Sequence, residues 1–113
     1  MAKAEFVLKG NFDIIIKKIE DGIEQGSLTA SLEESADHWV GNARMAVRVF
    51  ERFSYSGGNR VSLTVTLFQP EGTDIYVTAI TTGGSQAMFL KFNTFGEEAF
   101  LDKFRELMKD IGA

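Results

Sequence analysis

The spacing of apolar residues switches from a helical period to a strand period part-way along the chain and returns to a helical period at its end. Between Asn11 and Gly26, apolar residues recur at intervals of three and four, which predicts an amphipathic helix. Its apolar stripe consists of Phe12, Ile15, Ile16, Ile19 and Ile23. After Gly26, apolar and polar residues alternate, as they do in strands with one buried face. The chain is therefore expected to fold as helices packed against a sheet.

The alternating segments predict an antiparallel sheet of about five to six strands. A short strand opens the chain at residues 4–8, another follows the helix at 28–32, and the polar segment 34–42 interrupts the pattern. Residues 43–55 and 61–68 form the clearest hairpin, around a glycine-rich turn at 56–59. Two further strands, joined at residues 83–85, are expected to point these residues inward: Ile75, Val77, Ala79, and then Met88, Leu90, Phe92.

A second helix is predicted from Thr94 to Ile111. Thr94 and Glu97 form a capping-box pattern, and the apolar face that follows comprises Phe100, Phe104, Leu107 and Ile111. We therefore expect one α+β domain over residues 1–113, in the order β-α-β-β-β-β-β-α, with both helices on one face of the sheet.

Composition removes several classes of chemistry. The 113 residues include no cysteine, which excludes disulfides, thiolate metal sites and a cysteine nucleophile. A net charge of -4 disfavours nucleic acid and anionic membranes as partners. The first apolar stretch is too short for a signal peptide or a membrane span, so we expect a cytoplasmic protein that does not engage a membrane.

The topology resembles the TATA-binding-protein-like and helix-grip folds, which also return a long helix across an antiparallel sheet. Three segments are similar to those of a small bacterial family of unknown function: residues 46–52, 57–62 and 83–87. The fold resemblance implies an architecture but no activity, because one fold supports many functions.

No constellation of residues indicates an enzyme or a cofactor site. His38 is the only histidine and no nucleophile or metal motif accompanies it, so we interpret it as an exposed loop residue. The carboxylate pairs at 33–34 and 97–98 are typical of solvated surface. The glycines at 83–84 favour a tight turn over a phosphate cradle, since no lysine follows them as in a P-loop.

The alternation predicts an unusual mixture on the sheet face opposite the helices. Arginines and large apolar groups are both expected there: Arg44, Arg48, Phe50, Arg52, Phe68, Tyr76, Ile80 and Phe89. Such residues are enriched in protein interfaces, so our leading hypothesis is a homodimer formed through this face. Two alternatives stay open, an anion site on the three arginines, or a surface on which they pair with Glu33 or Glu51.

A second hypothesis concerns the space between the closing helix and the sheet. A pocket for a small apolar ligand is expected to be lined by Met45, Met88, Phe92, Phe100, Phe104 and Met108. Ordinary core packing explains the same residues. The sequence thus predicts a non-enzymatic, self-associating domain, with a carrier of a small apolar ligand as the alternative.

Overall fold

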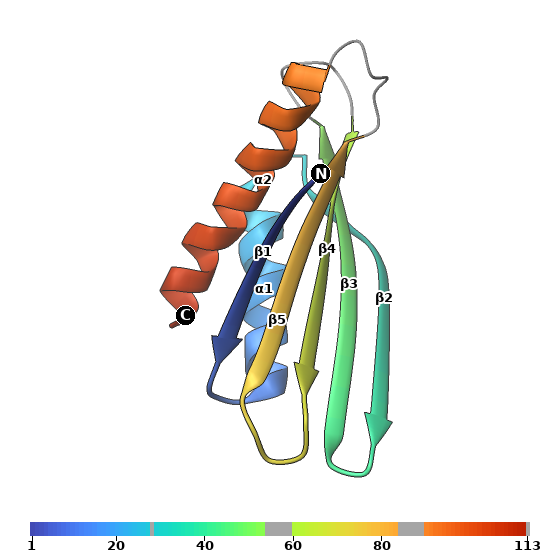
Figure 1. The fold of residues 1–113 in the computed structure, drawn as a ribbon, viewed down its shortest axis with the longest axis vertical. Coiled ribbons are helices and arrows are strands. Elements are labelled where there is room, and N and C mark those ends of the chain that lie inside the picture. The colour runs from blue at the N-terminus through green and yellow to red at the C-terminus, as the bar shows by residue number, and fades with distance from the viewer. Residues whose placement is uncertain (28, 54–59, 84–89, 113) are drawn as a thin grey trace.

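The computed structural model describes residues 1–27, 29–53, 60–83 and 90–112, and of residues 90–95 it describes the backbone alone. Five strands and two helices make up this part of the chain (Figure 1). Their bounds are β1 Ala2–Leu8, α1 Phe12–Gly26, β2 Ser31–Val40, β3 Ala43–Phe53, β4 Arg60–Gln69, β5 Ile75–Gly83 and α2 Leu90–Ile111.

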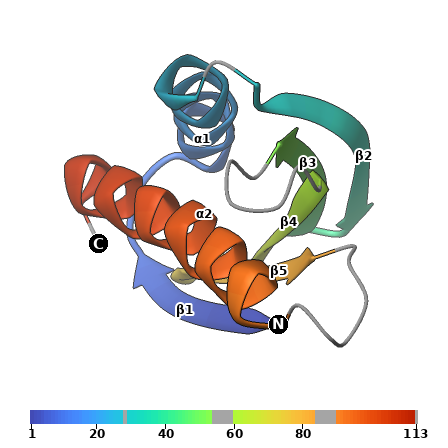
Figure 2. The same cartoon turned by 90° about the horizontal axis from the view of Figure 1, so that it is seen from above.

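The strands form one antiparallel sheet in the spatial order β1-β5-β4-β3-β2. Seen along the long axis of the molecule, the sheet bends around the two helices, which lie on its concave side (Figure 2). Helix α2 contacts β1, β5 and β4, whereas α1 contacts α2 and β2. The α+β class and the antiparallel sheet with two helices are thereby confirmed.

The core lies between the sheet and the helices. The predicted stripe of α1 is buried in full, and Asn11 caps the helix by accepting the backbone N–H of Ile14 at 3.0 Å. Strands β4 and β5 bury the residues that alternation assigned to the core: Val61, Leu63, Val65, Leu67, Ile75, Val77 and Ala79. From α2, the core receives Phe100, Leu101, Phe104 and Met108.

The predicted sixth strand does not exist at Leu90 and Phe92, because α2 already begins at Leu90. The edge of β5 on which such a strand would pair is occupied by β1, from Ala2 opposite Thr81 to Leu8 opposite Ile75. Met88, Phe89 and the predicted turns at 56–59 and 84–85 lie outside the described residues.

The predicted capping box at Thr94 and Glu97 is also wrong, since both residues lie inside α2. Glu97 is buried and has another role. Its carboxylate accepts the backbone N–H of Gly83 at 2.7 Å and pairs with the amino group of Met1. Glu97 thus ties α2 to the end of β5 and to the start of β1.

Strand β2 is longer than the alternation predicts and runs through the polar segment to Val40, so His38 is exposed but lies in a strand and not in the predicted loop. None of its ten residues is buried, and its register with β3 shifts between Leu32 and Glu34. An edge strand with little cover on either side has no need for an apolar face, which explains why the sequence pattern ends before the strand does.

Candidate functional site

Strand β3 presents to the helices the face that we expected to lie opposite them. Phe50 is fully buried and Arg48 is nearly so, while Met45, expected in a pocket, is more than one-third exposed on the outward face. The two-residue rhythm is correct, but its assignment to the two faces is wrong. Both sets of β3 side chains contain apolar groups, and the inner set includes arginines whose charges are neutralised from α1 and β2.

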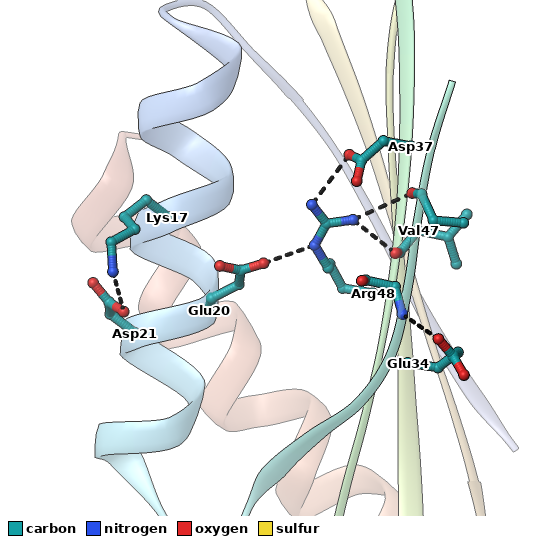
Figure 3. Close-up of polar contacts among 9 residues, drawn as sticks. Lys17, Glu20, Asp21, Glu34, Asp37, Val47 and Arg48 are labelled. Carbon is teal, nitrogen blue, oxygen red and sulfur yellow. Dashed lines mark hydrogen bonds and ion pairs between the residues drawn. The ribbon is translucent and has the colours of Figure 1, made fainter. Parts of the chain in front are cut away.

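Arg48 is the most deeply held of these arginines, with 9% of its side chain exposed (Figure 3). Its Nε donates to Glu20 of α1 at 2.7 Å, and Nη2 donates to Asp37 of β2 at 3.1 Å. Nη1 donates to the carbonyls of Val47 and Ala36. Burial alone would lower the pKa of Arg48, but the hydrogen bonds and charges of Glu20 and Asp37 outweigh it and raise the pKa.

Arg44 and Arg52 extend the same inner row. The guanidinium of Arg44 lies between the rings of Phe12 and Trp39, 4.3 and 4.8 Å from their centroids, and pairs with Asp13 at 2.7 Å. Arg52 lies over the ring of Phe100 at 4.5 Å. The three arginines therefore join β3 to the helix layer and do not form an anion-binding row on the outer face.

The predicted carboxylates do form ion pairs, but with a different arginine. Arg60 of β4 lies 2.8 Å from Glu51 and 3.7 Å from Glu33. These groups are partly exposed, so such pairs contribute little to stability.

The outer face keeps three of the predicted interface residues, Phe68, Tyr76 and Ile80, and gains others. The register places Val7, Tyr76, Phe68, Met45 and His38 opposite one another in a single row that crosses all five strands. Val40 lies on the same face, two residues beyond His38. We define the sheet patch as the large apolar residues exposed here: Val7 54%, Val40 79%, Met45 36%, Phe68 45% and Tyr76 49%.

Met45 was assigned to the pocket because the two faces of β3 were interchanged. Val7 and Val40 were missed because they lie on the two edge strands, where exposure depends on pairing. No described element covers this face. Side chains directly opposite on neighbouring strands lie about 5 Å apart, so four of these residues form a continuous strip. The row contains no Asp, Glu, Lys or Arg.

An opening of about 340 Å³ lies between the two helices, and we call it the helix opening. It is not the predicted pocket between helix and sheet, although Phe100 and Phe104 line it. Met108 is fully buried instead, Met45 is on the outer face, and Phe92 lies in the first turn of α2. The remaining lining residues are Gly22, Ile23, Gln25, Gly26, Ser27, Arg52, Lys103, Glu106, Leu107 and Asp110.

Among the described residues, no group of three or more His, Asp or Glu side chains is arranged to hold a metal ion. Neither α1 nor α2, as far as each is described, has an apolar stretch of the length needed to cross a bilayer. The described residues thus present an exposed apolar strip on the sheet and an opening between the helices.

This architecture defines the chain as a small α+β protein with one helix layer and one sheet face that no described element covers. The chain belongs to a family of unknown function, DUF6054, which matches residues 1–112. No curated protein and no solved structure matches it.

Proposed function

We propose that this chain is a non-enzymatic binding protein that pairs with a second copy of itself through the sheet patch. The observation that carries the proposal is the strip of exposed apolar side chains across neighbouring strands. Contiguous apolar surface of this kind is characteristic of protein contacts, whereas apolar residues scattered singly are ordinary.

A second copy suits this surface because, in a two-fold symmetric dimer, the same surface patch of each copy forms the interface. The row contains no Asp, Glu, Lys or Arg, so two copies meet there without burying an unpaired carboxylate, ammonium or guanidinium group. The nearest charges on β1, Lys3 and Glu5, already lie 3.4 Å from each other. An apolar strip with paired charges beside it is therefore complementary to itself.

The size of the patch sets the expected strength of pairing. Burying the exposed part of one such side chain contributes about 1 kcal/mol, so ten side chains in a dimer contribute about 10 kcal/mol. Association itself costs about 4 to 15 kcal/mol in lost freedom. At the lower end of this cost about 6 kcal/mol remains, which corresponds to a dissociation constant of about 40 µM, and a higher cost weakens the dimer. We therefore expect a dissociation constant in the range of about 40 µM to 1 mM.

Sedimentation equilibrium across this concentration range tests the proposal, with a mass approaching twice that of the chain as the expected result. In Phe68→Glu, a charge replaces an apolar group at the centre of the row. Because a two-fold dimer contains this change twice, we expect the dissociation constant to rise about 100-fold.

The matched control is Ile14→Glu. Ile14 is 55% exposed, similar to Phe68, but it belongs to the first turn of α1, where an acidic side chain is favourable. This variant should pair like the wild type. A wild-type chain that stays monomeric at about 1 mM, or a Phe68→Glu variant that pairs normally, overturns the proposal.

A further inference from the structure

The helix opening has an apolar floor. Ile23, Phe100 and Phe104 are buried at its base, and Leu107 is half-buried at its side. The helices approach closely at Gly22, where an added Cβ would lie only 2.4 Å from Leu107 Cδ1. One turn later, a Cβ at Gly26 would meet nothing within 4 Å. The two helices are therefore in contact at Gly22, and the space beside Gly26 is open.

Charged groups of opposite sign line the opening at different points along α2. Arg52 lies over the Phe100 ring, and Lys103 is one turn further along α2. Glu106 and Asp110 line the part of the opening nearer the end of α2. With a rise of about 1.5 Å per residue, Lys103 and Asp110 are separated by about 10 Å along the helix axis.

From this arrangement we propose that the helix opening binds a small zwitterion, a molecule with a carboxylate and an ammonium group at the two ends of a short apolar chain. The carboxylate faces Lys103, the ammonium faces Glu106 and Asp110, and the chain between them covers Phe104 and Leu107. A ligand with a single charge would pair with the charged residues at one end of the opening only. The charged residues at the other end would then face the apolar tail of the ligand. The volume suits a small ligand, at the lower end of the range for binding pockets.

Three probes of nearly equal length distinguish this ligand class: 6-aminohexanoate, hexanoate and hexylamine, each titrated at pH 7 while amide chemical shifts are recorded by NMR. We expect saturable shifts at Gly22, Gly26 and Leu107 with 6-aminohexanoate, and affinities at least about tenfold weaker for the two singly charged probes. Equal affinity for all three probes, or no shift with any of them, contradicts the proposal.

Two variants locate the site. Gly26→Phe fills the open space and should abolish the shifts caused by 6-aminohexanoate. Lys103→Glu reverses a charge at the cationic end and should weaken this probe while strengthening hexylamine. Lys109→Glu is the control, since Lys109 is exposed on α2 and does not line the opening.

Amide spectra of each variant without ligand verify that the fold is retained. If Gly26→Phe and Lys103→Glu both bind 6-aminohexanoate as the wild type does, the probe binds elsewhere and the proposal is wrong. The site is separate from the sheet patch, so this result is independent of the oligomeric state.

Discussion

Arg48 reaches the interior because every polar part of its guanidinium finds a partner. Glu20, Asp37 and two carbonyls accept from it, and they come from α1, β2 and β3. A buried charge with such partners is tolerated, whereas the same charge alone would be costly. Alternation in the sequence shows only that Arg48 shares a face with Phe50. It does not show that acidic residues far away in the sequence will meet it there.

We therefore expect the loss of Arg48 to lower protein stability mainly because it leaves the carboxylates of Glu20 and Asp37 without a positive partner. In Arg48→Met, the carboxylates of Glu20 and Asp37 face each other without a cation, and the free energy of unfolding should fall by about 2 to 4 kcal/mol. Adding Glu20→Gln and Asp37→Asn removes both charges and should restore at least about 1 kcal/mol. Urea unfolding measures these differences.

Arg105→Met provides the comparison, because Arg105 pairs with Asp102 and Glu98 on the exposed side of α2. Its loss should change stability by about 0.5 kcal/mol or less. Should the triple variant prove as unstable as Arg48→Met, the penalty does not come from the orphaned carboxylates.

For individual helices and strands, the spacing of apolar residues was enough to predict which face is buried wherever only one face of the element is apolar. Helix α1 and strands β4 and β5 are correct in extent and in orientation. Strand β3 was reversed because Met45, Val47 and Val49 form as good an apolar set as Ala46 and Phe50. The sheet patch was only partly predicted for the same reason. The helix opening depends on how the two helices pack against each other, and within the sequence only the glycines at 22 and 26 indicate it.

Strand β2 should be the least stable element of the sheet. It lies at an edge, buries none of its residues, and receives the Arg48 hydrogen bonds through Asp37 and Ala36. We expect β2 amides bonded to β3 to exchange with deuterium faster than those of β4. Asp37→Asn should accelerate β2 exchange by about tenfold and leave β4 unchanged.

The control on the same strand is Glu34→Gln, which keeps the side-chain acceptor for the backbone N–H of Ser35. This change should leave exchange in β2 unaltered. Equal acceleration of β2 and β4 in Asp37→Asn would mean that β2 opens only when the whole protein unfolds.

For the whole molecule, net charge and the proposed contact act in opposite directions. Each copy carries a net charge of -4, so two copies repel each other, while the sheet patch itself is uncharged. Salt screens the repulsion and leaves apolar contact intact. Dimerisation measured by sedimentation should therefore be unchanged or stronger when sodium chloride is raised from about 20 to 300 mM. Weaker pairing at high salt would indicate a contact made by charged groups.

Because both helices lie on one side of the sheet, back-to-back pairing would turn the two helix layers away from each other. Each layer would then form one outer surface of a four-layered particle, and its opening would point into solvent on the side remote from its twin. Such a particle could bridge two separate ligand-bearing objects. Because the openings would face opposite directions, they could not both reach one surface, so the pair would link two objects without gaining avidity for either.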